Sequence, residues 1–493
     1  MTGLRSDDPA PLDALDSLSG PILAELGRTL SREGYDTSAI ERAEAIAPRQ
    51  FDGVRLPLVD HRLAEEGASW ATLARLFAYR GVVSRSAVEA SLGEVLASAL
   101  IGAGVLVTDG EAVRARFVLM PFEDLYVLSD SLSAGREAVM GPGITTLQLA
   151  SAMDFASGDS VLDLGTGAGS LALLAARRGA RVIGTDISER AIRLARFNAR
   201  LNGLDVEWHV GDLFAPVAGR TFDRIVSQPP FVVSLATHGS TFLHGGERGD
   251  ELAMRVLAEA PMHLAPSGTA IVRVDAPVLP GEPVSQRVRA LLGERPFHVL
   301  AFASPGPSLD LQAVGYAQVA DPSLGERYGE IVRAYRARLG TLGFASTSQA
   351  LVLLEHAPDA PGHYALTLTP PSLRRIDSEA IADVRRALSR VAGPPDALVG
   401  AKLVVPEGTA VVEERLLGSD RVRTTIRFSK GPSADQEVSP TTAALLESFA
   451  VPRTVAEASR RFSELCDVDA EKVESQVQSF ARDALVRGML RLA

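Results

Sequence analysis

Three acidic residues lie in or directly after short apolar runs between residues 160 and 212, and a glycine-rich turn follows the first run. The acids are Asp163, Asp186 and Asp212, and the glycines are Gly165, Gly167 and Gly169. Glycine directly after a strand allows a sharp turn and lets a ligand approach the main chain closely. Carboxylates at one edge of a parallel sheet can accept hydrogen bonds from ribose hydroxyls and from an exocyclic amine. The pattern therefore predicts a nucleoside-binding site, although the glycines alone would also be typical of a plain tight turn.

The elements around these residues predict a doubly wound α/β sheet. Residues 161–164 and 181–184 are short apolar runs typical of buried strands, and residues 170–178 between them have helical spacing. Further strands are expected at 206–210 and 222–226. This alternation of strand and helix builds a Rossmann-like sheet. The glycine turn contains no lysine and no P-loop pattern, so a triphosphate ligand is not expected.

The end of the predicted strand 222–226 carries a second chemical signature, Gln228-Pro229-Pro230-Phe231. A side-chain amide oxygen and a backbone carbonyl fixed by proline can each accept one N–H of a planar nitrogen group. Such contacts draw the nitrogen towards tetrahedral geometry and free its lone pair, while an aromatic ring stacks on the flat group. The motif therefore predicts a site for a nitrogen nucleophile. A proline-stiffened strand end without chemistry is the alternative.

The DxGxGxG form of the turn resembles that of class I S-adenosylmethionine-dependent methyltransferases. Gln228 to Phe231 resembles the (Asn/Asp)-Pro-Pro-(Tyr/Phe) motif of methyltransferases that act on amino groups. These include the release-factor glutamine methyltransferases and the adenine or guanine N-methyltransferases of RNA and DNA. Residues 244–268 are similar to the segment that follows this motif in the glutamine group. The chain as a whole is similar to large bacterial methyltransferases in which helical modules flank the core.

This resemblance implies that S-adenosylmethionine is the cofactor. It implies that Gly165, Gly167 and Gly169 pass under the methionine part, that Asp186 holds the ribose, and that Asp212 and Leu213 lie at the adenine. The expected cofactor-binding set is completed by Asp163, Thr166 and Ile187. The expected catalytic set is Gln228, Pro229, Pro230 and Phe231.

The first position of the motif departs from the family pattern, because it is Gln228 and not asparagine or aspartate. The additional methylene moves the amide by about 1.5 Å, and a displacement of about 1 Å can cost roughly two orders of magnitude in rate. The leading expectation is N-methylation of a glutamine or related amide in a protein or peptide. Base methylation of RNA, N- or O-methylation of a small molecule, and cofactor binding by a regulator without turnover are the alternatives.

Other residues whose side chains could take part in chemistry form weaker patterns. His238, His244 and Glu247 lie in one loop with Arg248, and their spacing fits no helical metal motif, so no metal site is expected. A general base in this loop is an alternative, although polar loop residues without a chemical role are more common. Tyr126 is expected in the core rather than at the carboxylate of the cofactor.

Length and composition limit the remaining possibilities. The chain has 493 residues, a formal net charge of −11 and one cysteine, Cys466, which excludes a disulfide framework. The negative charge argues against broad affinity for polyanions. The sequence shows no signal peptide and no apolar run long enough to cross a bilayer, so a cytoplasmic protein without membrane contact is expected. Abundant alanine, arginine and glycine with few lysines suggest a bacterial source.

The chain is expected to form three modules. They are a helical, winged-helix-like module at 1–125, the methyltransferase domain at 126–356, and an α+β module at 357–493 that ends in a second winged-helix-like cluster. The third helix of the first module, EVLASALIGAG, carries no arginine or lysine, so DNA is not an expected partner. The flanking modules are expected to recruit or enclose the substrate. Residues 139–153 either close over the cofactor or form a plain connector.

Overall fold

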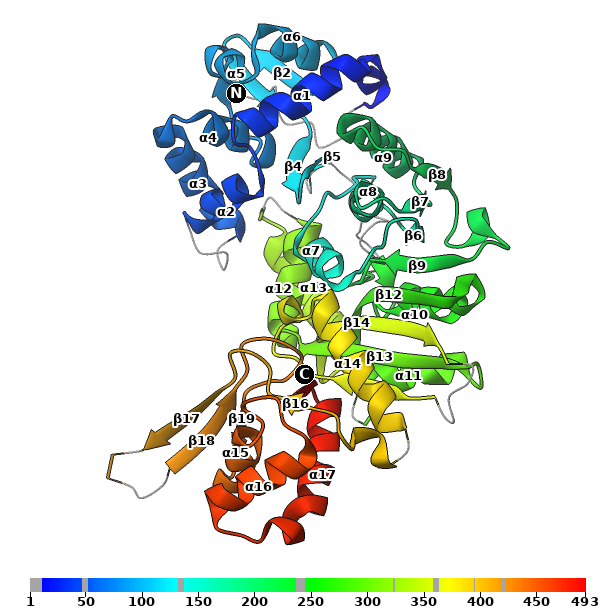
Figure 1. Cartoon of the computed structure of the whole chain (residues 1–493). Coiled ribbons are helices and arrows are strands. Elements are labelled where there is room, and N and C mark those ends of the chain that lie inside the picture. Colours follow the sequence, from blue (N-terminus) through cyan, green and yellow to red (C-terminus); the bar gives the residue numbers. More distant parts are fainter. Residues whose placement is uncertain are drawn as a thin grey trace.

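The structure is a computed structural model that describes residues 11–46, 52–131, 137–235, 244–279, 281–321, 324–357, 363–393, 395–415, 417–418 and 422–493. Its centre is an eight-stranded sheet of order β15-β13-β14-β12-β9-β6-β7-β8 (Figure 1). The strands are β6 (Ser160–Leu164), β7 (Arg181–Asp186), β8 (Glu207–Val210), β9 (Phe222–Ser227), β12 (Leu264–Val278), β13 (Phe297–Pro305), β14 (Ser346–His356) and β15 (Ala365–Leu368).

Strand β6 lies where the order of the sheet reverses. β7 and β8 follow on one side of it and β9 and β12 on the other, and these five strands are parallel. β14 is antiparallel to both β12 and β13, and β15 runs parallel to β13 at the edge. Ligands of such sheets bind at the carboxyl ends of the strands beside the reversal. The predicted α/β fold is confirmed, and β15 extends the sheet past residue 356.

Helices cover both faces of the sheet. α7 (Ile144–Ala152), α8 (Ser170–Arg177) and α9 (Glu189–Asn202) share one hydrophobic core, and α10 (Glu251–Glu259) and α11 (Val284–Leu292) share the other. Successive side chains of a strand point to opposite faces. Accordingly, Ile271 of β12 joins the first core and Val272 joins the second.

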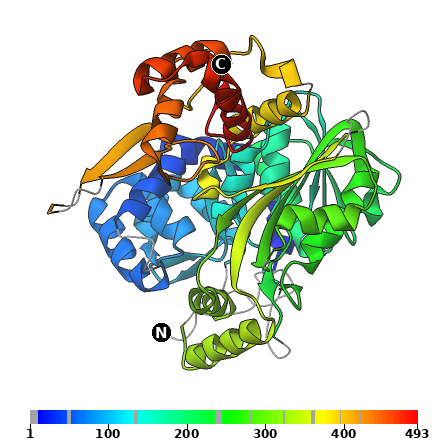
Figure 2. The same ribbon diagram turned by 90° about the horizontal axis from the view of Figure 1, so that it is seen from below.

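A pair of helices, α12 (Leu309–Ala320) and α13 (Tyr328–Thr341), lies in the chain between β13 and β14. Figure 2 shows this pair standing away from the sheet. The pair packs through its own apolar cluster against β10 (Val232–Val233), which pairs with β11 (His244–Gly246) directly after the Gln228 motif. The pair thereby covers the chain that leaves the motif.

The elements before the sheet are mostly helical. They are η1 (Asp13–Ser17), α1 (Gly20–Arg32), α2 (Thr37–Ala45), α3 (Asp52–Glu66), α4 (Ser69–Leu73), a π turn η3 (Ala74–Ala78), α5 (Arg85–Leu92) and α6 (Glu94–Gly102). The strands β1 (Val83–Ser84), β3 (Ala112–Ala115) and β2 (Leu106–Asp109) form a small antiparallel sheet, and β4 (Val118–Phe122) pairs with β5 (Leu125–Ser129). α1 packs on α9 and joins this region to the central sheet.

Two boundaries in this region differ from the pattern of the sequence. Helical spacing over residues 12–33 predicts one helix, but the chain forms η1 and α1 because Pro21 occupies the first turn of α1, where proline starts helices. Residues 112–120 are predicted as one strand of a hairpin, but they are divided between β3 and β4, which belong to different sheets.

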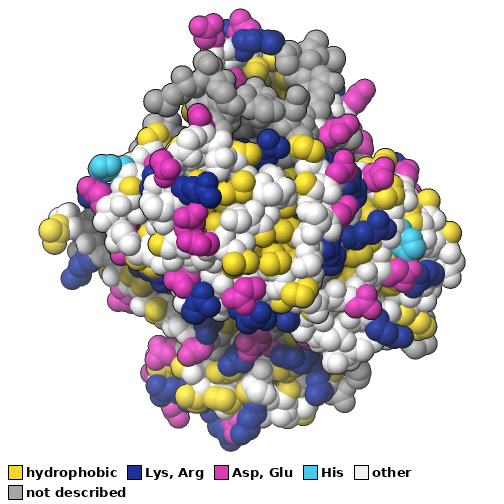
Figure 3. Space-filling view, turned by 90° about the horizontal axis from the view of Figure 1, so that it is seen from above, with side chains coloured by type: hydrophobic (Ala, Val, Ile, Leu, Met, Phe, Trp, Pro, Cys, Tyr) yellow, Lys and Arg dark blue, Asp and Glu magenta, His cyan; other side chains and the backbone are white. Residues whose placement is uncertain are grey.

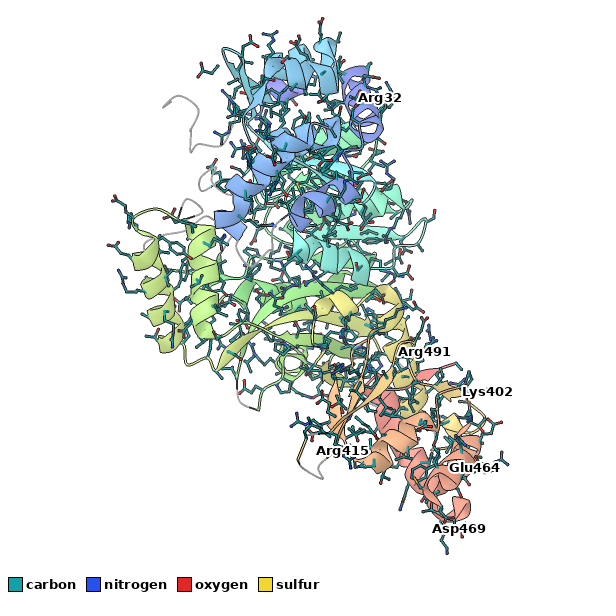
Figure 4. The ribbon with its side chains drawn as sticks, turned by 90° about the vertical axis from the view of Figure 1, so that its left-hand side faces the viewer. Arg32, Lys402, Arg415, Glu464, Asp469 and Arg491 are labelled. Carbon is teal, nitrogen blue, oxygen red and sulfur yellow. The ribbon has the colours of Figure 1, made fainter. Side chains whose placement is uncertain are left out.

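The elements after the sheet form an α+β region. They are η6 (Leu373–Arg375), α14 (Ser378–Ala392), η7 (Pro395–Leu398), β16 (Leu403–Val404), β17 (Ala410–Arg415), β18 (Val422–Arg427), β19 (Gln436–Val438), α15 (Pro440–Glu447), α16 (Val455–Cys466), α17 (Ala470–Val486) and β20 (Arg491–Leu492). β17, β18 and β19 form a sheet that projects from the molecule (Figure 1). Arg32 and Asp469 in Figure 4 mark the opposite ends of the molecule. None of the described helices is long and apolar enough to span a membrane.

Candidate functional site

The glycine turn between β6 and α8 is held by a buried carboxylate. Gly165, Gly167 and Gly169 have φ values of 73°, 55° and 88°, which favour glycine. Asp163 accepts a hydrogen bond from the Thr166 hydroxyl at 2.6 Å and another from the backbone N–H of Ala172 at 3.0 Å. Burial raises the pKa of Asp163 to about 6. Asp163 therefore fixes the shape of the turn from its buried side.

Asp186 joins the turn to the next strand end. Its carboxylate accepts the N–H of Gly167 at 2.9 Å and the N–H of Ser188 at 2.8 Å. Burial raises its pKa, and these backbone hydrogen bonds oppose the rise. A carboxylate has about four acceptor positions. Asp186 therefore retains acceptor capacity for hydroxyl groups of a ligand.

The third strand end is more open. The side chain of Asp212 is 58% exposed and lies 3.5 Å from Arg255. Leu213 follows with a φ of 45°, a left-handed conformation that is uncommon for leucine. Strained backbone of this kind is concentrated at binding sites. The side chain of Ile187, after β7, is largely exposed.

One cavity of about 1,030 Å³ joins these strand ends to the Gln228 motif. Of the predicted site residues, its lining includes Asp163, Gly165, Thr166, Gly167, Asp186, Ile187, Asp212, Leu213, Gln228, Pro229 and Pro230. Gly169 and Phe231 do not line it. Gly169 instead lets the turn approach α9 and β8, because a Cβ there would lie 3.0 Å from Trp208 and 3.1 Å from Ala195.

The Gln228 motif is held by partners far away in the chain. The Gln228 amide nitrogen donates to the Thr145 hydroxyl at 2.7 Å, and the Thr146 hydroxyl donates to the Gln228 amide oxygen at 3.3 Å. Phe231 packs into the apolar cluster of α12 and α13, and its carbonyl accepts a hydrogen bond from Tyr316 at 3.4 Å. The ring predicted to stack on a substrate therefore packs against protein in this structure.

The segment before α7 and the start of α7 line the cavity. Val139, Met140, Gly141 and Thr146 line it, together with Pro11 to Asp13 of the amino-terminal region. Asp130, whose side chain is 2% exposed, forms a 2.6 Å ion pair with Arg190 of α9 and accepts the N–H of Val139 at 2.9 Å. These contacts anchor the segment to α9, and the closing role of residues 139–153 stays a prediction.

The weaker candidates lie elsewhere. His238 is outside the described residues, and Glu247 is an exposed residue 3.8 Å from Arg338. Arg248 lies over the Phe344 ring at 5.9 Å. Tyr126 packs 6.4 Å from the Tyr35 ring, as expected for a core residue. Within the described ranges, no group of three or more His, Cys, Asp or Glu residues is placed to hold a metal ion.

The residues of the cavity fit S-adenosylmethionine. Asp186 and Asp212 offer acceptors for hydroxyl groups and an amine, while Ile187 and Leu213 offer apolar surface for a base. The glycine turn brings main-chain atoms to the ligand without a Cβ in the way. Acidic residues outnumber arginines along the lining, which suits a sulfonium cation.

Comparison with known proteins points to the same chemistry. Residues 142–284 match the family model of the methyltransferase small domain. The chain is 40% identical over 136 residues to the release factor glutamine methyltransferase of Deinococcus radiodurans, covering 25% of this chain and 49% of that protein. It is 37% identical over 129 residues to the ribosomal protein uL3 glutamine methyltransferase of Bradyrhizobium diazoefficiens, covering 24% and 40%.

A ribosomal RNA small subunit methyltransferase C from Alcanivorax borkumensis is also similar. It is 32% identical over 146 residues, which cover 27% of this chain and 41% of that protein. The chain thus spans half or less of the length of each of these three relatives. Each alignment covers about a quarter of this chain, and the matched family model ends at residue 284, before β13, β14 and β15.

Several residues of the site were not predicted from the sequence. Asp130 and Arg190 anchor the segment before α7, and no short-range pattern connects two residues that lie 60 positions apart. Thr145 and Thr146 do have a signal, because hydroxyl residues after Gly143 are typical of a helix start. That signal indicates the helix but not the contact with Gln228.

Proposed function

We propose that this protein transfers a methyl group from S-adenosylmethionine to the nitrogen of a glutamine or related amide in a protein or peptide. The observation that carries the proposal is the single cavity joining the glycine turn, Asp186 and Asp212 to Gln228, Pro229 and Pro230. The two relatives named glutamine methyltransferases support the choice of acceptor.

The cofactor, when bound, supplies an electrophilic methyl group on a sulfonium. In this proposal Asp186 accepts hydrogen bonds from the ribose hydroxyls, and Asp212 accepts one from the adenine amine. Ile187 and Leu213 provide the apolar surface for the base. Asp163 acts on the turn, through Thr166 and Ala172, rather than on the ligand.

The acceptor nitrogen is oriented by oxygen atoms of the motif. The carbonyl of Pro230 faces Gly245, where a Cβ would clash, and the carbonyl of Phe231 is covered by Gly249 and Tyr316. We therefore assign the Gln228 amide oxygen and the Pro229 carbonyl oxygen as the two atoms that accept hydrogen bonds from the substrate nitrogen. Orientation of a bound nucleophile lowers the barrier because the entropy of bringing the groups together is already lost on binding.

The charges around the cavity favour a protein acceptor over RNA. Six acidic residues line it, namely Asp13, Glu137, Asp163, Asp186, Glu189 and Asp212, against Arg190 and Arg193. Both arginines are already paired, with Asp130 and with Asp13. RNA binding depends on cations that neutralise phosphates. RNA base methylation is the second candidate, because the Alcanivorax borkumensis relative is named as an RNA enzyme.

The flanking regions are proposed to recruit the acceptor, in the cytoplasm of a bacterium. α4, α5 and α6 with the β1-β3-β2 sheet have the helix and strand order of a winged-helix-like module. Acidic and basic side chains are interspersed on this face of the molecule (Figure 3). This supports a protein contact rather than DNA. We place the boundary of the catalytic domain after β15, because that strand completes the sheet.

The proposal is tested by labelled methyl transfer into lysate fractions. Lysate from cells that lack the gene is incubated with the protein and methyl-tritiated S-adenosylmethionine, then separated into protein, RNA and small molecules. We expect label in the protein fraction and as N-methylglutamine after digestion. Label in RNA or in small molecules would move the acceptor to those alternatives. Cofactor binding without transfer into any fraction would favour a regulator.

A further inference from the structure

The amide of Gln228 is held on both sides by neighbouring hydroxyl groups at the start of α7. Its nitrogen donates to Thr145 at 2.7 Å and its oxygen accepts from Thr146 at 3.3 Å. Thr146 is 8% exposed, and both it and Gln228 line the cavity. The contacts span 82 and 83 positions of the chain, so they require α7 to lie against the end of β9.

The hydrogen bonds of Thr146 agree with the orientation of the Gln228 amide in the structure. The backbone N–H of Gly143 donates to the Thr146 hydroxyl oxygen at 3.2 Å, so the proton of that hydroxyl is available for another acceptor. The Gln228 atom opposite Thr146 is the amide oxygen, which accepts that proton. An amide has two N–H donors and two oxygen lone pairs. Thr146 uses one lone pair of Gln228 and leaves the second for a ligand in the cavity.

The length of glutamine matters for this arrangement. Asparagine or aspartate at position 228 would end about 1.5 Å short, by one C–C bond. The additional methylene lets the amide of Gln228 reach α7 while it still lines the cavity. Glutamine in place of the asparagine or aspartate of the family motif is therefore matched by Thr145 and Thr146, which bind its amide.

We propose that Thr145 and Thr146 are positioning residues that hold the Gln228 amide with its second oxygen lone pair directed at the N–H of the methyl acceptor. This inference rests on the proposed function, because it assumes that Gln228 contacts the acceptor. Thr145 does not line the cavity, so its hydroxyl acts on an acceptor through Gln228. The start of α7, which lines the cavity, thereby also aligns the methyl-acceptor group.

The hydrogen bond itself can be tested without any acceptor. The full-length protein is produced deuterated and with [¹⁵N]glutamine, and is then saturated with S-adenosylhomocysteine. The NMR signal of the Gln228 side-chain amide is assigned by its loss in Gln228→Asn. Thr145→Val keeps the shape of the side chain and removes the hydroxyl. We expect it to shift the Gln228 signal and speed its exchange with water, and Thr145→Ser to restore both. Ser151→Ala, on the exposed far end of α7, is the matched control. An unchanged Gln228 signal in Thr145→Val would overturn the proposal.

The consequence for catalysis is tested with the tritium-transfer assay. Thr145→Val should reduce the transfer rate by about tenfold or more, as expected for a displaced contact group, while calorimetry shows unchanged affinity for S-adenosylhomocysteine. Thr145→Ser should recover most of the rate. The double variant Thr145→Val/Gln228→Asn should be no slower than Gln228→Asn alone. Both substitutions remove the same contact, the Gln228 amide oxygen held in place for the methyl acceptor. A double variant slowed by the product of the two single losses would contradict positioning through Gln228.

The two proposals fail in different ways. A wild-type protein that binds S-adenosylhomocysteine but methylates no lysate fraction would refute the proposed function. In that case the Gln228 amide signal still decides whether the threonines hold the amide. Normal transfer by Thr145→Val, with the signal shifted, would leave the proposed function standing and refute the positioning role.

Discussion

The two ends of the cavity are built in different ways. At the nucleoside end, the hydrogen bonds of Asp163 and Asp186 join residues 2 to 19 positions apart. At the acceptor end, Gln228 and Phe231 contact residues 82 to 85 positions away. The cofactor end is therefore specified by one strand-turn-helix-strand unit. The acceptor end depends on α7 and α12 being placed correctly by the rest of the fold.

The segment before α7, which lines the cavity, provides the largest expected effect. Arg190→Ala leaves the buried carboxylate of Asp130 without its partner, and breaking a buried ion pair costs about 3–5 kcal/mol of unfolding free energy. Arg193→Ala is the control, because its partner Asp13 is 89% exposed and surface pairs contribute little. Urea denaturation of both variants measures the difference. Equal losses of unfolding free energy in the two variants would show that the pair of Asp130 and Arg190 does not anchor the segment before α7.

Asp163 makes the nucleoside end sensitive to pH. Its pKa is raised by burial from 3.8 to about 6, so between these values the folded state keeps a proton that the unfolded state has lost. The contribution of Asp163 to stability is then present below about pH 4 and is lost as the pH rises through about 6. A shift of about two pKa units corresponds to roughly 3 kcal/mol.

Between pH 4 and pH 7, the free energy of unfolding of the wild-type protein should therefore fall by roughly 3 kcal/mol relative to that of Asp163→Asn. Chemical denaturation at several pH values measures it for both proteins. Parallel pH profiles of the two proteins would rule out a raised pKa at this position.

Gln228→Ala addresses the acceptor end alone. Loss of the amide oxygen should lower the methyl-transfer rate by about a hundredfold, the effect of misplacing a reacting group. The affinity for S-adenosylhomocysteine should stay the same, because Asp186 and the glycine turn are untouched. Transfer assays and calorimetry on one preparation test both statements. A turnover equal to that of the wild type would remove Gln228 from the catalytic set.

Asp186→Ala addresses the nucleoside end. Stranding the ribose hydroxyls should weaken cofactor binding by about 1–3 kcal/mol. Calorimetry with S-adenosylhomocysteine gives the value directly, and at saturating cofactor the transfer rate should return towards that of the wild type. If the affinity does not change, the ribose is held elsewhere. If saturation fails to restore the rate, the two ends of the cavity are not independent.

The local character of the nucleoside end explains why it could be predicted. The strands at 161–164 and 181–184 and the glycine turn follow from short apolar runs and from residue types that tolerate positive φ. The Asp130–Arg190 pair and the threonines that hold Gln228 depend on chain segments brought together by folding. Phe231 shows the limit clearly. An aromatic residue after two prolines suggests a substrate contact, yet the α12–α13 cluster packs against it.

The helical pair α12–α13 is inserted between β13 and β14, on the far side of the sheet order from β7 and β8, where the cofactor residues lie. It contacts the chain directly after Gln228, Pro229 and Pro230 through Val232, Val233 and the Phe231 carbonyl. We therefore expect that exchanging this insertion changes the choice of methyl acceptor and leaves cofactor binding unchanged. Chimeras that swap only residues 306–345 would reveal whether acceptor choice travels with that block.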